Sequence, residues 1–128
     1  MSVEIVGSAE LVAKLESLSD RLGELSDEAL AELADRIVED AKSLCPVDTG
    51  SLRRSIRWER DPSGGVIIAA GGGGVINPRT KREVDYAAYV EFGTSRAPAQ
   101  PFLQPAIEQN ISALEEILAK KIEGAVRG

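Results

Sequence analysis

Three groups of residues have types and spacing that suit chemistry, but each lacks something its chemistry needs. Asp48-Thr49-Gly50 has the form of the aspartic-protease triplet, which requires a second aspartate opposite the first. A dimer could supply it, yet the triplet follows a helical pattern rather than a hydrophobic strand. Cys45 has no histidine anywhere in the chain to activate its thiol. Gly71–Gly74 is not followed by the Lys-Ser or Lys-Thr of a phosphate-binding loop. We therefore predict a protein that is not an enzyme, with no catalytic residue, metal or cofactor.

The composition indicates one acidic globular domain spanning residues 1–128. The chain is 43% hydrophobic and 28% charged, which is ordinary for a domain with one core. Its formal net charge of −6 argues against nucleic-acid binding by the chain as a whole. One cysteine cannot form an internal disulfide, so a reducing compartment is expected. Neither a membrane-spanning run nor a signal-peptide pattern is present, so we expect no membrane contact.

Positive charge is concentrated in the middle of the chain. Between Ser51 and Val84 there are seven cations and three anions. This middle could meet acidic helices of a neighbouring copy, or it could be one solvated face of a sheet. A nucleic-acid-binding module that uses the basic segment 53–82 is the alternative function. Salt-sensitive DNA binding would support that alternative, whereas the few aromatic residues count against it.

Hydrophobic spacing predicts helices in the N-terminal part, after a short strand at Val3–Val6. Ser8 is expected to cap a first helix, whose apolar residues are spaced by three and four: Leu11, Leu15, Leu18, Leu22 and Leu25. Ser26 is expected to cap a second stretch with the same kind of face: Leu30, Leu33, Ile37, Ala41 and Leu44. The pattern allows two helices or one long helix that breaks near Gly23.

The middle of the chain predicts a β-hairpin followed by a long loop. Leu52, Ile56 and Trp58 alternate with polar residues, which indicates a half-buried strand over 55–60 and a returning strand over 66–70. Trp58 is expected in the core, with an anchor to a neighbouring subunit as the alternative.

The segment 71–84 has no periodicity, and such a loop in a small domain is usually functional or disordered. We predict that it is flexible and that it supplies subunit contacts through Gly71, Gly72, Gly73, Gly74, Arg79, Lys81 and Arg82.

The C-terminal part predicts a short helix, an extended arm and a long helix. The short helix covers 86–92 and ends at Gly93 in a left-handed cap. Prolines at 98, 101 and 105 keep the arm extended, and the long helix is expected to begin near Pro105. The fold class is therefore α+β, with N-terminal helices and a long C-terminal helix packed on a small, mostly antiparallel sheet.

Two motifs about forty residues apart carry a family resemblance that covers roughly Leu33 to Leu118. They are an Asp-Thr-Gly turn and a Glu-Phe-Gly-Thr turn that leads into Gln-Pro-Phe-Leu-Gln-Pro-Ala. In this order and spacing, the chain resembles the head–tail joining and tail-completion proteins, also called neck or minor tail proteins, of long-tailed bacteriophages. The structural motif residues are Asp48, Thr49, Gly50, Leu52, Tyr89, Glu91, Phe92, Gly93, Thr94, Pro101, Phe102 and Pro105.

The resemblance implies a structural virion protein of the phage neck or tail end. It implies a homo-oligomeric ring, a hexamer by family and tail-tube symmetry, that joins head to tail or completes the tail. Its expected partners are further copies of itself, the connector or adaptor, and tail-tube or tail-terminator proteins. DNA would pass through without being specifically bound, and assembly would take place in the bacterial host cytoplasm. The resemblance also implies that Glu91 pairs with Arg53 or Arg54.

Overall fold

The computed structural model describes residues 3–6, 10–15, 18–19, 23–24, 27–47, 50–62 and 64–127. The elements follow one another as β1 (Val3–Val6), β2 (Glu10–Leu15), β3 (Leu18–Ser19), β4 (Gly23–Glu24), α1 (Asp27–Leu44), α2 (Ser51–Ser55), β5 (Arg57–Arg60), β6 (Val66–Ala70), α3 (Ala87–Phe92) and α4 (Leu103–Arg127).

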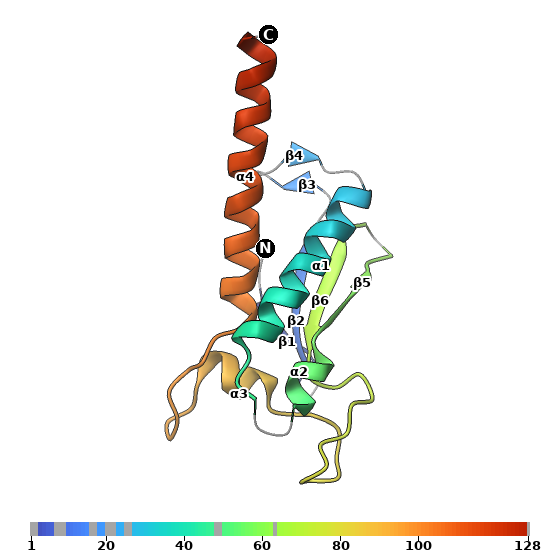
Figure 1. Ribbon diagram of the computed structural model, residues 1–128. Coiled ribbons are helices and arrows are strands. Elements are labelled where there is room, and N and C mark those ends of the chain that lie inside the picture. The colour runs from blue at the N-terminus through green and yellow to red at the C-terminus, as the bar shows by residue number, and fades with distance from the viewer. Residues whose placement is uncertain are drawn as a thin grey trace.

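The main sheet is antiparallel, in the order β1-β2-β6-β5, and helices cover one of its faces. α1 crosses the sheet in contact with β5 and β6, and α4 packs alongside α1 (Figure 1). A separate pair of very short strands is formed by β3 and β4. The predicted α+β class, with a long C-terminal helix on a small antiparallel sheet, is confirmed.

The prediction of a helix over Leu11 and Leu15 is wrong, because these residues belong to strand β2. Leu11, Ala13 and Leu15 are buried, whereas Val12 is partly exposed and Lys14 is exposed. Residues four apart share one face of a helix, but they also share one face of a strand, so the spacing alone fitted both. Of the other positions in that interpretation, Leu18 lies in β3 and Gly23 in β4. Ser8, Leu22, Leu25 and Ser26 lie outside the described residues.

The hydrophobic core lies between the sheet and the two long helices. α1 contributes a continuous buried stripe at helical spacing: Leu30, Leu33, Ala34, Ile37 and Ala41. The sheet supplies Leu11, Val66 and Ile68 to the same cluster. Leu44, the last residue of the predicted α1 stripe, is instead 43% exposed. Trp58 packs partly buried at the edge of the core, and its Nε1–H donates to Asp35 Oδ1 at 2.7 Å.

Strand β5 begins two residues later than expected, because Ser51–Ser55 form the short helix α2. Leu52, Ser55 and Ile56 are all buried, and this three-and-four spacing is that of a helical turn. The remainder of the predicted hairpin is confirmed, since β5 pairs with β6 from Arg57↔Ala69 to Arg60↔Val66.

Helix α4 is packed over its first half and extends past the sheet over its second (Figure 1). Among the α4 residues whose side chains are described, Leu103, Ala106, Ile107 and Ile111 are buried and Ile117 is 43% exposed. α4 begins at Leu103 rather than near Pro105. A proline in the first turn is tolerated because the N–H it removes has no acceptor within the helix. Within the described part of the chain, no helix is long and apolar enough to span a membrane.

Cys45, just after α1, is a buried thiol. Its side chain is packed in the core, and its Sγ lies 3.4 Å from the carbonyl oxygen of Pro46. Burial is the largest of three effects on the pKa of Cys45, which rises from 9.0 to about 11. The positive charge of Arg53 lowers this pKa by a smaller amount, and the negative charge of Glu91 raises it slightly further. The thiolate is therefore disfavoured in the folded protein.

We predict that Cys45 is alkylated by iodoacetamide at pH 8 roughly a hundredfold more slowly in the folded protein than in the unfolded chain. Because the folded-state pKa is raised, the stability linked to this thiol is fully present below pH 9.0 and is lost as the pH rises towards 11. Equal alkylation rates with and without denaturant would show that the thiol is accessible.

Candidate functional site

The carboxylate of Glu91 binds the start of helix α4. Its Oε1 accepts hydrogen bonds from the backbone N–H of Phe102 at 3.0 Å and of Leu103 at 2.8 Å, and its Oε2 accepts from Gln104 at 3.0 Å. The Glu91 residue is only 3% exposed. The prediction that Glu91 pairs with Arg53 or Arg54 is therefore corrected: three backbone amides satisfy this carboxylate. Its negative charge also lies at the positive end of the α4 dipole.

Glu91 and Pro105 together remove the unsatisfied donors from the first turn of α4. The first N–H groups of a helix have no acceptor within the helix itself. Here Glu91 binds those of residues 102, 103 and 104, and Pro105 has no N–H to satisfy. Phe102 and Leu103 are fully buried. Because unpaired buried N–H groups are costly, this arrangement allows the helix to begin inside the core.

Gly93 turns the chain sharply between α3 and the arm. Its backbone has φ 76° and ψ 177°, a region that is essentially restricted to glycine. The positive φ expected for a left-handed cap is therefore present, but ψ is extended rather than helical, which corrects the prediction of a left-handed cap. A Cβ atom at Gly93 would lie 2.6 Å from the backbone nitrogen of Ala99. Thr94 then closes the turn, since its Oγ1 accepts from the N–H of Arg96 and of Ala97.

The arm is hydrogen-bonded back onto the end of α3. The N–H of Gln100 donates to the carbonyl of Val90 at 2.8 Å, and the N–H of Thr94 donates to the carbonyl of Ala97 at 2.9 Å. Pro101 is exposed at the point where the arm enters α4. The Glu-Phe-Gly-Thr turn and the proline-rich arm thus form one hydrogen-bonded junction between α3 and α4.

Exposed apolar side chains flank this junction. Tyr89 and Phe92 are 62% and 50% exposed on α3, whereas Glu91 between them points inward. Leu44 and Val47, at the end of α1 and just after it, are also exposed, at 43% and 61%. Cys45 lies between Leu44 and Val47 in the sequence, and the Glu91 carboxylate of α3 is near enough to raise the pKa of its thiol. We call Leu44, Val47, Tyr89 and Phe92 the apolar end patch.

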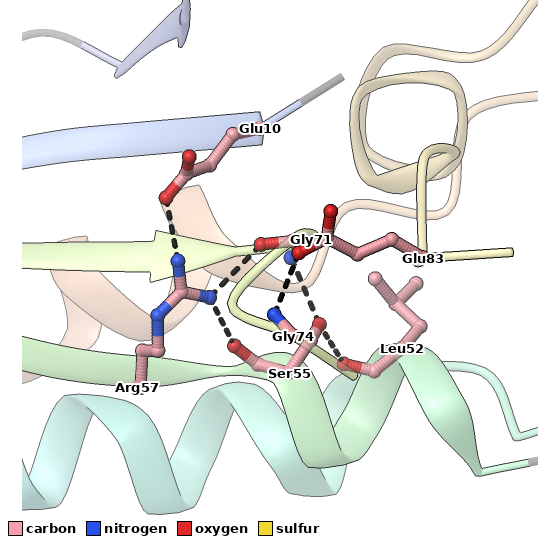
Figure 2. Close-up of polar contacts among 7 residues, drawn as sticks. All are labelled: Glu10, Leu52, Ser55, Arg57, Gly71, Gly74 and Glu83. Atoms are coloured by element: carbon pink, nitrogen blue, oxygen red, sulfur yellow. Dashed lines mark hydrogen bonds and ion pairs between the residues drawn. The ribbon is translucent and has the colours of Figure 1, made fainter. Parts of the chain in front are cut away.

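Arg57 lies at the centre of a polar cluster where β5 and β2 begin and β6 ends, as Figure 2 shows. From β5 it reaches across the end of β6 to β2, and its Nη2–H donates to Glu10 Oε1 at 2.5 Å. Its Nη1–H groups donate to the carbonyls of Ser55 at 2.8 Å and of Gly71 at 2.9 Å. The guanidinium therefore links two strands that are not neighbours to the start of the glycine segment.

Ser55 completes this cluster from within the core. Its buried hydroxyl donates to the carbonyl of Leu52 and accepts from the N–H of Gly71 at 2.8 Å. Gly71 is thus held through both its N–H and its carbonyl.

The four glycines have a conformational and a steric role. All of them have positive φ, from 64° to 85°, which L-residues with side chains rarely adopt. A Cβ atom at Gly73 would lie 2.8 Å from the guanidinium carbon of Arg57, whereas one at Gly74 would meet nothing within 4 Å. The N–H of Gly74 donates to Glu83 Oε1 at 2.6 Å, which joins the two ends of the segment.

The remainder of the 71–84 segment forms a loop closed by hydrogen bonds, with one antiparallel β-bridge between Ile76 and Glu83. The N–H of Gly72 donates to the carbonyl of Val84, and that of Val84 donates to the carbonyl of Val75. Asn77, which is largely buried, accepts from Lys81 through its carbonyl and from Arg79 through its side chain. The segment therefore has defined internal structure, and its mobility in the free protein stays a prediction.

The motif residues fall into buried supports and exposed turns. Leu52, Glu91 and Phe102 are buried, whereas Tyr89, Phe92, Thr94 and Pro101 are exposed. Gly50 adopts a left-handed conformation before α2, and its carbonyl accepts from the N–H of Arg54. Asp48 and Thr49, the first two residues of the Asp-Thr-Gly turn, lie outside the described residues.

The sequence interpretation missed Ser55, Arg57 and Glu10 as a cluster. Arg57 and Glu10 are separated by 47 positions, and no local pattern links them. The glycine run was the available signal, because consecutive positive-φ residues suit a backbone that passes close over another group.

Of the predicted interface residues, Arg79, Lys81 and Arg82 are exposed at the far end of the segment. The nucleic-acid-binding alternative over 53–82 stays a prediction, although Arg57 is engaged within the fold. Across the described residues, no group of three or more cysteine or acidic side chains is placed to hold a metal ion.

We predict that Glu91→Ala lowers the free energy of unfolding by about 2–3 kcal/mol, because three backbone N–H groups lose their acceptor at a buried helix start. Glu91→Gln retains an acceptor oxygen but no charge and should cost about 1–2 kcal/mol. The control Glu116→Ala, at an exposed α4 position, should stay within about 0.5 kcal/mol. Urea unfolding measures all three, and a parent-like midpoint for Glu91→Ala would contradict this role.

Two alanine substitutions at glycines separate backbone strain from steric overlap. Gly74→Ala should cost about 1–2 kcal/mol, the price of a positive φ in open space. Gly93→Ala should cost more than about 3 kcal/mol, because the new methyl group also overlaps the backbone at Ala99. Thermal unfolding followed by circular dichroism measures the difference, and equal losses for the two variants would contradict the close approach at Gly93.

Comparison with known protein families gives one match. Residues 9–93, about two thirds of the chain, match a family model described as "Bacteriophage HK97-gp10, putative tail-component". No curated protein and no solved structure matches the chain significantly. The match covers the sheet from β2 onward, α1, the Arg57 cluster and α3 up to Gly93. The chain belongs to this bacteriophage tail-component family.

Proposed function

We propose that the protein is a structural component of the phage neck or tail end, where copies of it form a homo-oligomeric ring that joins head to tail or completes the tail. The observation that carries this proposal is the family match over residues 9–93. The ring has six subunits, in keeping with the symmetry of a tail tube. It acts in the virion by assembly rather than by catalysis, and DNA passes through it without being specifically bound.

The surface of the subunit supports an assembly role. The apolar end patch leaves Tyr89 and Phe92 at least half exposed on a helix of six residues. Large exposed aromatic residues are typical anchors of protein–protein contacts, because they bury much area at little entropic cost. The partners of this patch are neighbouring copies of the chain, the connector or adaptor, and the tail-tube or tail-terminator proteins.

The rigid junction beside the patch supports the same role. Glu91 and Gly93 hold α3 against the arm and α4, so Tyr89 and Phe92 are presented by a hydrogen-bonded backbone rather than by a free loop. A preorganised contact surface loses less conformational entropy when it binds. The buried residues of the motif thus build the support, and its exposed residues make the contact.

We predict that a phage lacking this gene releases unattached heads and tails, and that the parent gene supplied in trans restores infectious titre. A Tyr89→Ser/Phe92→Ser gene should restore the titre at least about a hundredfold less well, because a ring repeats the lost contact at every interface. Electron microscopy of the lysates and plaque counts are the measurements.

Two controls accompany this test. The double-serine protein should keep parent-like helix content and melting temperature, since both side chains are exposed. Ile117→Ser, an exposed apolar position on α4 away from the patch, should complement fully. A normal titre without the gene would contradict the proposed function, and full complementation by the double-serine gene would contradict the role of the patch.

A further inference from the structure

The far end of the 71–84 segment presents a fixed positive surface. Lys81 has φ 62°, a left-handed conformation that is uncommon outside glycine, and its N–H is bound by the carbonyl of Asn77. The N–H of Asn77 in turn donates to the carbonyl of Arg82. These bonds close residues 77–82 into a compact turn from which the side chains of Arg79, Lys81 and Arg82 are exposed. We call these three residues the basic tip.

The outer face of α1 is the complementary negative surface. Glu28, Glu32, Asp35 and Glu39 are exposed at spacings of four, three and four, so they form one line along the helix. That line lies opposite the buried stripe that contains Leu30, Ile37 and Ala41. Arg36 borders this line and pairs with Glu32 at 3.0 Å, and Lys42 follows Glu39 by three residues. Asp35 also accepts a hydrogen bond from Trp58 Nε1–H at 2.7 Å, so within the described part of the chain Glu28 and Glu39 are its unengaged carboxylates. We call these four carboxylates the acidic face.

The two surfaces are separated within one subunit. The 71–84 segment leaves β6 and projects away from the sheet, whereas α1 begins at the opposite end of the sheet and lies across its face (Figure 1). Among the described residues, the side chains of Lys81 and Arg82 have no hydrogen-bond or ion-pair partner, and neither do those of Glu28 and Glu39. Complementary patches of this kind favour association between molecules and fix its register.

We propose that the basic tip of one copy docks on the acidic face of α1 of the next copy. Because the two patches differ, the contact is head-to-tail, and repeating it around an axis closes a ring. This proposal rests on the proposed ring. It adds that each subunit meets one neighbour through its basic tip and the other neighbour through its acidic face. The contact is exposed and ionic, so added salt weakens it.

Zero-length carbodiimide coupling tests this proximity directly, because it joins an amine to a carboxylate that touches it. A mixture of ¹⁴N- and ¹⁵N-labelled full-length protein at low salt should give mixed-isotope peptide pairs that link Lys81 to Glu28, Glu32 or Glu39. Lys81→Arg is the matched control, because it retains the charge and the assembly but removes the coupling amine. Rings whose cross-links never join the basic tip to the acidic face would overturn the proposal.

Charge reversal tests the head-to-tail polarity. Variant A carries Lys81→Glu and Arg82→Glu, and variant B carries Glu28→Lys and Glu39→Lys. Each alone should self-associate about tenfold or more weakly than the parent, because it places like charges together. Their equimolar mixture should recover assembly, since the reversed tip of A meets the reversed face of B, and the native tip of B meets the native face of A.

Sedimentation velocity at low and high salt measures these outcomes. Variant Glu116→Lys on α4 is the control for a general charge effect and should assemble like the parent. If A and B each assemble as the parent does, the contact is overturned while the ring remains. If the parent protein does not self-associate at any concentration, both this contact and the ring of the proposed function are contradicted.

Discussion

The contact between the Glu91 carboxylate and the first amides of α4 is the interaction on which this structure depends most. It lets a long helix begin at two fully buried residues, Phe102 and Leu103, without leaving their N–H groups unpaired. It also ties α3 to α4 across the arm, together with the backbone bond from Gln100 to Val90. The exposed side chains of Tyr89 and Phe92 therefore project from a fixed frame.

Arg57 holds a second turn in place, where β5 and β2 begin and β6 ends. Its three hydrogen bonds join β2, the end of α2 and Gly71, and the backbone at Gly73 passes close over its guanidinium. The basic tip thus projects from an anchored base. The apolar end patch and the basic tip, to which we assign subunit contacts, each adjoin a polar cluster, with Glu91 and Ser55 buried and Arg57 and Glu10 partly exposed. A small domain of this kind can divide its sequence between residues that hold turns in place and residues that those turns display.

Local signals predicted α1, the β5–β6 hairpin and α3, and the structure has each of them. The alternation assigned to the first hairpin strand nevertheless included Leu52 of α2 and Ile56, which ends that helix. β2 was mistaken for a helix because Leu11 and Leu15 share a face in either conformation. The partner of Glu91 and the Arg57–Glu10 pair could not be predicted, because a buried charge needs some partner but the sequence does not say which group the fold brings to it.

Amide hydrogen exchange of the isolated protein, resolved by NMR, tests the central claim most directly. N-terminal helix amides ordinarily exchange quickly because nothing within the helix accepts their hydrogen bonds. If Glu91 holds the start of α4, the amides of Phe102, Leu103 and Gln104 should be protected to about the same degree as that of Ile111 in the packed part of the helix. Exchange of these three amides at the rate of an unstructured peptide, beside a protected Ile111, would contradict the account.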